Sequence, residues 1–296
     1  MHFDWYQATI DAPAQVILDA AMASLDGAHE VEHIDRGGSG YKASAAIRDR
    51  RGDMMAFMLH GSKSAAPNLR GSSHHAEPIA SFIREHYPVH AVSRVDVAED
   101  MTAPDLFESL KTVMQRISTA HGLESGLSII PDTAERGSTY YVGSDKSATR
   151  VRLYQKDFER ASKGEIALAE ADPDLTRLEI QCRPQKKAKR MFATKTTEEA
   201  WGASKWTQHL ASVVLKLDVE RLNLRPREES DLERTTAQIV HQYRKHAIKH
   251  GTVISRMEDG LVMPSARDAI EAFAERLKTD MLREHEIRTG AYTPPR

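Results

Sequence analysis

The sequence predicts an α+β fold in which an antiparallel sheet carries helices on one face, followed by C-terminal helices. Short segments of alternating apolar and polar residues recur along the first two thirds of the 296 residues and are typical of half-buried strands. Segments with apolar residues three or four positions apart lie between them and predict helices. Through residue 99 the order is strand, helix, strand, strand, helix, strand. This βαββαβ order is the ferredoxin-like one.

The first of these elements is a strand over residues 4–10, DWYQATI. A helix follows, which begins at Asp11 or Pro13, with Asp11 able to cap it, and ends at Gly27. Two strands, YKASAAIRD and DMMAFMLHG, are joined by the turn-like RRGD. The Ser-, Pro- and Gly-containing stretch 62–73 predicts an exposed loop.

A helix at residues 77–87 then leads to the strand VHAVSRVDVAE. The next helix has Pro104 near its start, an apolar stripe from Leu106 to Ile117, and Gly122 past its end. Three strands follow, GSTYYVG, ATRVRLYQK and LTRLEIQCR, and then one helix over residues 197–217. Thr196 and Glu199 have the spacing of a capping box for that last helix.

Pro226 marks a predicted boundary between a main domain, residues 1–225, and a helical C-terminal region, residues 226–296. Two charged helices are expected there, over 230–250 and 266–286. The second has an apolar stripe that must cover the main domain or a second copy of the protein, with the first arrangement favoured. No internal repeat is evident in the sequence.

Composition limits the location and the partners. The one cysteine, Cys182, has no partner for an internal disulfide, and no apolar run reaches the roughly 20 residues that cross a bilayer, so a cytoplasmic protein without membrane contact is expected. Net charge is only −2, but Lys146 to Arg190 holds 12 Lys/Arg against 7 Asp/Glu. The densest part, RPQKKAKR, contains Lys186 and Lys187 and is either a polyanion site or a solvated basic loop.

Strand parity gathers charged residues on one face of the predicted sheet, because residues two apart in a strand point the same way. In ATRVRLYQKD this rule places Arg150, Arg152, Tyr154 and Lys156 together, opposite Val151 and Leu153. The same parity pairs Arg177 with Glu179, and Arg94 with Asp96, on the sides of their strands opposite the apolar residues. With helices on the other face, these strands would line an open face with carboxylates, cations and a tyrosine.

Such a face suits cleavage of a phosphodiester. Asp96 and Glu179 offer hard oxygen ligands for Mg²⁺ or Mn²⁺, which would polarise the phosphate. Tyr154 would be the nucleophile, and Arg152 and Lys156 would lower its pKa from the usual value near 10. The competing interpretation is that the same charges form surface ion pairs between neighbouring strands, with tyrosine present because it suits strands.

The turn between two of these strands, YVGSDKS, favours the chemical interpretation. Gly143, Ser144 and Ser147 can offer backbone N–H and hydroxyl groups to a phosphate, with Lys146 beside them. His74 and His75 have no intervening residue, unlike a His-hydrophobic-His metal motif, and are interpreted as solvated. Tyr140 and Tyr141 are adjacent, so one is expected in the core and the other at the turn or stacked on a base.

Taken together, these motifs resemble the Rep_trans-type replication initiation factors of rolling-circle plasmids and phages, which are relatives of certain conjugative relaxases. The family pattern is a Tyr-x-Gly-Ser turn with a Ser three residues on, then Arg-x-Tyr-x-Lys-x-x-Glu, then an Arg-x-Glu strand. The chain departs at Asp145, where the family often has a basic residue. The resemblance is sharp over residues 92–181, loose before them, and absent after about residue 225. The matching positions are Tyr141, Gly143, Ser144 and Ser147, then Arg152, Tyr154, Lys156 and Glu159, then Arg177 and Glu179.

The resemblance implies a DNA nickase that works by transesterification. Tyr154 would attack an origin phosphate, leave a 5′-phosphotyrosine and a 3′-hydroxyl primer, and later rejoin the displaced strand. A conjugative relaxase with the same chemistry, or a non-catalytic origin-binding protein, are the alternatives. Three roles stay open for the C-terminal helices: reading duplex DNA, forming a homodimer, or recruiting a host helicase. The expected DNA and phosphate contacts are Arg94, Gly143, Ser144, Lys146, Ser147, Arg150, Arg177, Lys186 and Lys187.

Overall fold

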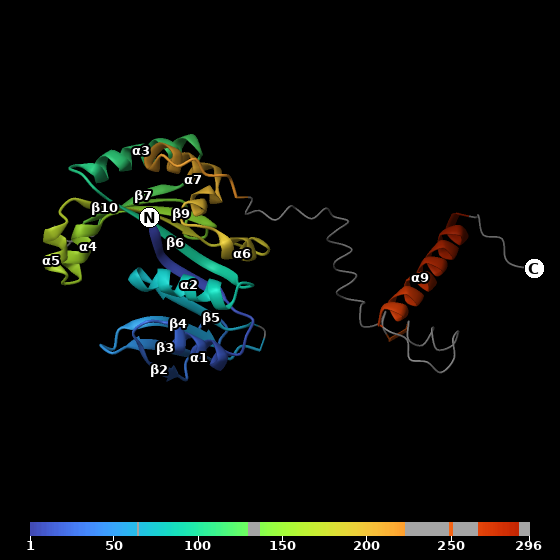
Figure 1. Cartoon of the computed structure of the whole chain (residues 1–296). Coiled ribbons are helices and arrows are strands. Elements are labelled where there is room, and N and C mark those ends of the chain that lie inside the picture. Colours follow the sequence, from blue (N-terminus) through green and yellow to red (C-terminus); the bar gives the residue numbers. More distant parts are fainter. Residues whose placement is uncertain (64, 130–136, 223–248, 251–265, 290–296) are drawn as a thin grey trace, which may run out of the picture. The chain divides into compact units, whose positions relative to one another are not determined.

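The structure is a computed structural model that describes residues 1–63, 65–129, 137–222, 249–250 and 266–289. The chain divides into two units, Met1–Pro226 and Arg227–Arg296 (Figure 1). The second unit contains the helix α9 (Ala266–Thr289), which begins where the sequence predicts its last helix and ends a few residues later. The other predicted C-terminal helix, 230–250, lies almost wholly outside the described residues.

The first unit is built on a ten-stranded sheet of order β2-β3-β4-β5-β1-β6-β10-β9-β8-β7, in which every pair of neighbouring strands is antiparallel. The strands are β1 (His2–Thr9), β2 (Ala28–Ile34), β3 (Ala43–Asp49), β4 (Met54–His60), β5 (Asn68–Ser72), β6 (Ala91–Thr102), β7 (Ser125–Ile129), β8 (Ser138–Val142), β9 (Thr149–Gln155) and β10 (Leu175–Cys182). The helices of this unit are α1 (Ala14–Ser24), α2 (Ala76–His86), α3 (Leu106–Ala120), α4 (Lys156–Ser162), α5 (Ile166–Ala171), α6 (Ala188–Met191) and α7 (Lys205–Leu210), with short turns η1 (Ser73–His75), η2 (Phe192–Thr194), η3 (Glu199–Ala203) and η4 (Ala211–Leu215).

The sheet is two topological halves joined at β1 and β6. In each half a central strand is followed by a helix and then by four strands that return from the edge of the sheet to that central strand. The first half is β1, α1 and β2 to β5, and the second is β6, α3 and β7 to β10. Because β1 and β6 pair antiparallel, the halves are related by an approximate two-fold. The order and pairing of the elements are therefore repeated, although no repeat is evident in the sequence.

The mixed helix and antiparallel-sheet class is found, but the ferredoxin-like order is not, because two strands before residue 99 are unpredicted. One is the edge strand β2, whose exposed Glu30, Glu32 and His33 conceal the alternation. The other is β5, inside the stretch predicted to be a loop. A Cβ on Gly71 of β5 would lie 2.7 Å from Ile79 Cγ1, so the glycine lets α2 pack directly on this strand.

Two helix predictions need correction. Helix α1 begins after Pro13, and no side chain caps it, so Asp11 is not its cap. The single helix expected over 197–217 is broken at Ser204, which forms its own capping box at the start of α7. The predicted reciprocal bonds between Thr196 and Glu199 are present and begin the short turn before the break.

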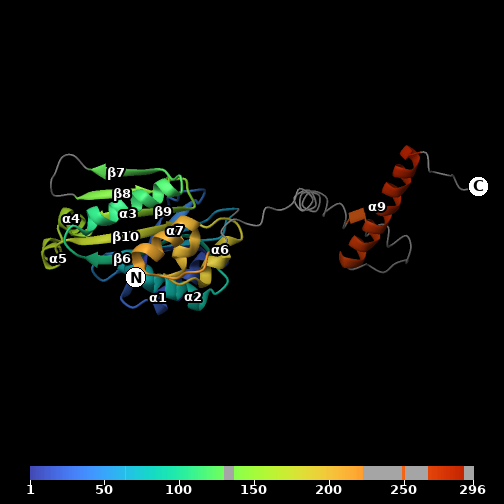
Figure 2. The same cartoon turned by 90° about the horizontal axis from the view of Figure 1, so that it is seen from above.

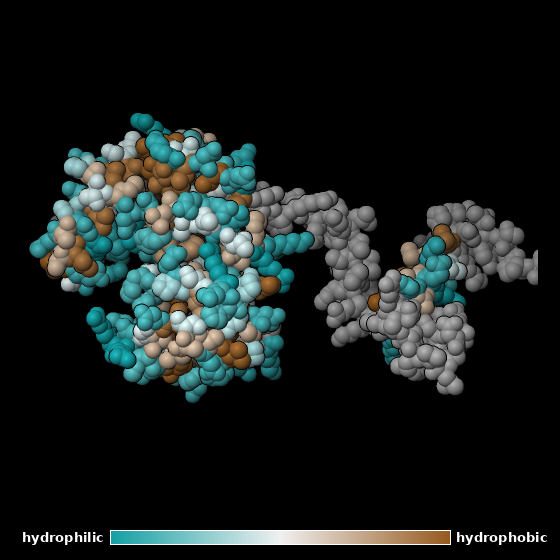
Figure 3. Space-filling model, viewed as in Figure 1, coloured by the Kyte–Doolittle hydropathy of each residue, from teal (hydrophilic) through white to brown (hydrophobic). Residues whose placement is uncertain are grey.

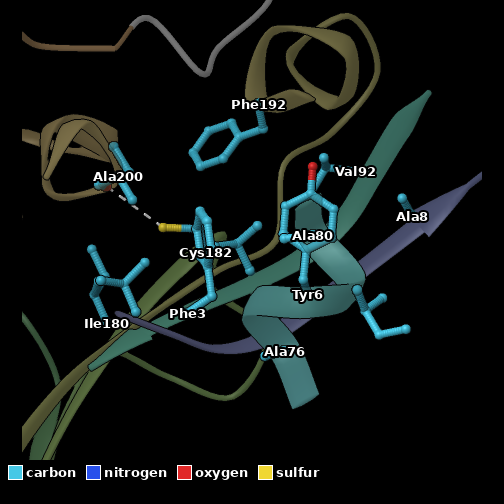
Figure 4. Packing of buried hydrophobic residues seen from close by; sticks show 14 of the residues in the cluster. Phe3, Tyr6, Ala8, Ala76, Ala80, Val92, Ile180, Cys182, Phe192 and Ala200 are labelled. Atoms are coloured by element: carbon cyan, nitrogen blue, oxygen red, sulfur yellow. Dashed lines mark hydrogen bonds between the residues drawn. The ribbon is translucent and has the colours of Figure 1, made fainter. Parts of the chain in front are cut away.

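Apolar residues of α1, α2, α3 and α7 join the inward-facing strand residues in one core. Figures 1 and 2 together show α3 and α7 over one face of the second half. Cys182 is fully buried in this core near Phe192, its thiol 3.7 Å from the carbonyl oxygen of Ala200, and burial raises its pKa (Figure 4). Cys182 is therefore a packed thiol of the core.

The opposite face of the sheet, here called the open face, lies away from that core. It carries the polar residues of the central strands, and α4 borders it in the second half, so the helices do not all cover one face. In Figure 3 hydrophobic residues gather over the outer helices, while hydrophilic residues cover much of the surface in view. Within the described residues, no helix is long and apolar enough to span a bilayer.

Candidate active site

Tyr154 lies near the end of β9 on the open face, paired in register with Arg177 of β10 and Thr139 of β8. Its side chain is only 7% exposed. The guanidinium carbon of Arg152 lies 5.1 Å from the ring centroid, and Lys156 Nζ lies 5.7 Å from it. The parity argument correctly brought Tyr154 and Arg152 to one face.

Lys156 reaches Tyr154 by a different route from the one predicted. Strand β9 ends at Gln155, and Lys156 is the first residue of α4, so strand parity does not apply to it. Its ammonium group pairs with Glu159, one turn further along α4. Glu159 in turn accepts from Lys163 Nζ at 2.6 Å. The family-type Lys-x-x-Glu pair is thus a helical pair beside the tyrosine.

A pocket of about 280 Å³ opens beside the tyrosine. It is bounded by β8, β9 and α4, so the surface available to a ligand lies between the sheet and this inserted helix. Its lining includes Tyr154, Arg152, Tyr141, Thr139 and Glu159.

Asp96 and Glu179 lie on adjacent strands of the open face, and each is only 1% exposed. Arg94 Nε donates to Asp96 at 2.9 and 3.1 Å, and Gln181 Nε2 donates to it at 3.3 Å. Arg152 Nη2 donates to Glu179 Oε2 at 2.6 Å. The ion pairs of the competing interpretation therefore exist, but their carboxylates are buried, unlike those of ordinary surface pairs.

One oxygen of this cluster is unsatisfied. Glu179 Oε1 is buried and has no hydrogen-bond partner. Burial raises the pKa of Glu179, and the charge of nearby Asp96 raises it further, although Arg152 opposes both effects. A buried acceptor without a donor is costly unless a ligand or ion supplies the missing contact. The described residues contain no cluster of three or more His, Cys, Asp or Glu suited to a metal.

The pKa of Tyr154 is raised, contrary to the expectation from its cationic neighbours. Burial is the largest cause, and the charge of Glu179 adds to it, while Arg152 and Arg177 act in the opposite direction. The two nearby cations do not compensate for burial and for the carboxylate. Positive charge added near the Tyr154 hydroxyl would act in the same direction as the two arginines and lower this pKa.

Arg177 is 6% exposed and is bound by two carboxylates that the sequence analysis did not single out. Its Nε and Nη2 contact Asp100 at 2.5 and 2.7 Å, and its Nη1 contacts Asp4 Oδ1 at 2.7 Å. Asp100 shares the parity of Asp96 and could have been found from it, whereas Asp4 required the pairing of β1 with β6. Each of its three side-chain nitrogens has a carboxylate partner, so Arg177 ties three strands together.

The turn between β8 and β9 is ordered by its own residues. Gly143 has φ of +92°, and a Cβ there would lie 2.9 Å from Thr149 O, so the turn requires glycine. Ser144 and Ser147 hydrogen-bond through their hydroxyls at 2.9 Å. Asp145 pairs with Arg150, and Lys146 is exposed.

Tyr140 is buried in the core, whereas Tyr141 lies on the open face, so the expected division of these two tyrosines is confirmed for Tyr140. The guanidinium carbon of Arg150 lies 4.0 Å from the centroid of the Tyr141 ring. Both residues line a second pocket of about 350 Å³ together with Gly143 and Ser144. Tyr141 borders both this pocket and the Tyr154 pocket.

Lys186 and Lys187 are exposed in the connection between β10 and α6. They follow the Cys182 end of β10, whereas Tyr154 pairs with Arg177, near the other end of that strand. The basic segment is therefore on the surface, apart from the cluster around Tyr154.

The model of the Rep_trans family, described as replication initiation factor, matches residues 90–215. That segment runs from β6 through α7 and contains Tyr154, Asp96 and Glu179. No curated protein matches the sequence. Among solved structures, a rolling circle replication initiator protein from Geobacillus stearothermophilus is similar, with 16% identity, a TM-score of 0.47, and coverage of 76% of this chain and 98% of that one. Residues 90–215 of the chain are therefore similar to the Rep_trans family of replication initiation factors.

Proposed function

We propose that the protein initiates rolling-circle replication by nicking one strand of an origin with Tyr154 as nucleophile. The observation that carries this proposal is the juxtaposition of a pocket-lining tyrosine with Arg152 and the buried Glu179 within the segment that matches the family. A tyrosine, a strong cation and a carboxylate with one free oxygen are the groups that a phosphoryl-transfer site needs.

In the proposed reaction, the Tyr154 hydroxyl loses its proton and its oxygen attacks the phosphorus of the scissile phosphodiester. The bond from phosphorus to the 3′ oxygen breaks, and that oxygen takes a proton to become the 3′-hydroxyl primer. The tyrosine keeps the 5′ phosphate. One phosphodiester replaces another, so the step is reversible, and the reverse attack by a 3′-hydroxyl rejoins a strand.

Asp96 and Glu179 would hold a Mg²⁺ or Mn²⁺ ion. The unpartnered buried Glu179 Oε1 fits this role, and one or two carboxylates plus substrate phosphate and water are typical ligands of Mg²⁺. When bound, the cation would polarise the phosphate and lower the pKa of a nearby phenol. It would also neutralise the carboxylate charge that, with burial, raises the pKa of Tyr154.

The cationic side chains would act on the phosphate and on the tyrosine. Arg152 lies between Glu179 and the Tyr154 ring, so it can hold the metal ligand and face the charge that develops on the phosphate. Lys156 lies over the same ring and can stabilise the phenolate. The turn of Gly143, Ser144 and Ser147, with Lys146 and the Arg150–Tyr141 pair, would hold DNA next to the nick.

A non-catalytic origin-binding protein is the second candidate, and the burial and raised pKa of Tyr154 favour it. On that view Arg94, Arg152 and the exposed Lys186 and Lys187 would hold DNA that a partner cuts. A conjugative relaxase would share the transesterification chemistry and differ in its biological context.

Supercoiled DNA from the protein's own genetic element, incubated with Mg²⁺ or Mn²⁺, tests the proposal. The wild type should produce nicked circles, and EDTA should abolish them. Tyr154→Phe should lose nicking. Tyr141→Phe removes one hydroxyl on the same face but keeps the ring that contacts Arg150, so it should retain nicking. Asp96→Asn and Glu179→Gln should lose metal-dependent nicking. Equal nicking by wild type and Tyr154→Phe would exclude Tyr154 as the nucleophile.

A further inference from the structure

A column of alternating aromatic rings and guanidinium groups crosses the open face in the first half of the sheet. The guanidinium carbon of Arg70, on β5, lies 4.6 Å from the ring centroid of Phe57 on β4 and 5.1 Å from that of Trp5 on β1. The guanidinium carbon of Arg94, on β6, lies 4.3 Å from the Trp5 ring. We name Phe57, Arg70, Trp5 and Arg94 the arginine–aromatic column.

The central ring of this column is held in a fixed orientation by a chain of side-chain hydrogen bonds. Trp5 Nε1 donates to Gln7 Oε1 at 3.1 Å, and Gln7 Nε2 donates to Asn68 Oδ1 at 2.6 Å. Asn68 Nδ2 then donates to Thr9 Oγ1 at 3.1 Å and to Ser93 Oγ at 3.3 Å. Each side chain in this hydrogen-bonded series has a partner, so the Trp5 indole is held in place before any ligand binds.

The column has more positive charge than its surroundings neutralise. Arg94 is paired with Asp96, but Arg70 has no ion pair or hydrogen bond within the described part of the chain. The strands β4 and β5 contain no acidic residue. Burial lowers the pKa of Arg70, and the charge of Arg94 lowers it further, so an anion brought between the two guanidinium groups would relieve their repulsion.

The column also occupies an informative place in the repeated topology. By strand order, β1, β5 and β4 of the first half correspond to β6, β10 and β9 of the second. In the second half these strands carry Asp96, Glu179 and Tyr154, the groups of the proposed chemistry. In the first half the open face of β5 and β4 presents Arg70 and Phe57, without a carboxylate. The second half therefore contains the residues of the proposed reaction, whereas the corresponding strands of the first half contain residue types suited to binding.

We propose that the arginine–aromatic column binds single-stranded DNA and leads it across β4, β5 and β1 to the Tyr154 site on the same face. Arg70 keeps its N–H groups free for a phosphate, because it has no hydrogen bond within the described part of the chain. The Phe57 ring has only one guanidinium over it among the described residues, so its other face can stack on a base that is unpaired. The four residues of the column lie on the adjacent strands β4, β5, β1 and β6, which together span about 14 Å. Asp96 is also on β6, so the column ends beside a residue of the proposed Tyr154 site. This inference rests on the proposed function for its biological ligand, but binding can be measured without nicking.

The test uses the full chain carrying Tyr154→Phe, which cannot form the proposed adduct, and a fluorescein-labelled single-stranded oligonucleotide from the origin. Fluorescence anisotropy gives its Kd. Adding Arg70→Ala, or Phe57→Leu, should weaken binding by about tenfold, the scale of one lost stacking contact. Arg48→Ala is the matched control, because Arg48 is on the same face of β3 but is paired with Glu32. It should change the Kd by less than about twofold, as expected for an exposed ion pair.

The thermal unfolding midpoints of the variants must match that of the parent protein. If Arg70→Ala does not, Arg70→Lys replaces it. That variant keeps the charge but loses the planar group that stacks on the rings, so it should still weaken binding. For the same oligonucleotide as a blunt duplex, the column variants should have the same Kd as the parent protein. Unchanged single-strand binding in folded column variants, or equal losses for both forms of DNA, would overturn the proposal. Failure of the wild type to nick would refute the proposed chemistry while leaving this comparison valid.

Discussion

Arg152 Nη2 donates a hydrogen bond to Glu179 Oε2 at 2.6 Å, between residues directly paired in the register of β9 and β10. The same guanidinium lies over the ring of Tyr154. One arginine thus connects the proposed nucleophile to a proposed metal ligand. It also compensates part of the cost of a carboxylate that is 1% exposed.

This relationship predicts a thermodynamic coupling. Arg152→Gln should lower the free energy of unfolding by about 1–3 kcal/mol, because Glu179 remains buried without its charged donor. The double variant Arg152→Gln/Glu179→Gln should recover much of the loss, since two amides can bond without a buried charge. Urea unfolding of the two single variants and the double variant measures the coupling. Strictly additive effects would mean that the two side chains do not interact.

Arg177 predicts a larger structural effect. Arg177→Leu leaves Asp4 and Asp100 unpaired between three strands, so the free energy of unfolding should fall by about 3–5 kcal/mol. Asp100→Asn should cost less, because Arg177 keeps its bond to Asp4. Chemical denaturation ranks the two variants. The reverse order, or a stable Arg177→Leu protein that has lost only DNA binding, would assign Arg177 to phosphate contact instead.

Gly143 predicts a backbone effect in the turn. Its φ of +92° and the 2.9 Å approach of Thr149 O leave no room for a Cβ, so Gly143→Ala should destabilise the protein by about 1–3 kcal/mol. Gly126→Ala is the control, because a Cβ at that position meets nothing within 4 Å. Differential scanning calorimetry should show a lowered Tm for the first variant and little change for the second. Equal Tm values would show that the turn relaxes around the methyl group.

His90 predicts a pH dependence of stability. Burial lowers its pKa below the ordinary 6.5, and the ring is held between the Tyr6 hydroxyl at 2.6 Å and Tyr87 O at 2.7 Å. Below pH 6.5 the unfolded chain binds a proton that the folded chain refuses, so this contribution is complete above 6.5 and is lost as pH falls. Urea unfolding from pH 7.5 to 5.5 should show a steeper loss for wild type than for His90→Gln, by at most about 1.4 kcal/mol per pH unit. Parallel curves would mean that His90 titrates normally.

Much of the candidate site could be predicted from the sequence because strand parity is a local rule. It placed Tyr154, Arg152, Glu179 and Asp96 on one face before any pairing was known. It failed at Lys156, where β9 ends and α4 begins. The pKa of Tyr154 was predicted with the wrong sign, because parity reveals which charges are near but not how deeply the ring is buried.

The fold was harder to predict, because its missing elements depend on long-range packing. Strand β2 is an exposed edge, and β5 becomes a strand only because β1, β4 and α2 surround it. When β2 and β5 are left out, the elements through residue 99 have the ferredoxin-like order. The repeated order of elements in the two halves then cannot be recognised. Asp4 escaped notice for the same reason, since its partner Arg177 is far along the chain.

Tyr154 is tested as the nucleophile most directly by identifying the residue that becomes covalently attached to DNA. Wild-type protein is incubated with Mg²⁺ or Mn²⁺ and a suicide oligonucleotide that contains the nick site, then digested with nuclease and trypsin and analysed by mass spectrometry. Cleavage after Arg152 and Lys156 releases Leu153–Lys156, in which Tyr154 is the only tyrosine. We expect a nucleotide 5′-phosphate on this peptide in the wild type and none in the Tyr154→Phe protein. An adduct on Tyr141, or on any other residue, would contradict this expectation.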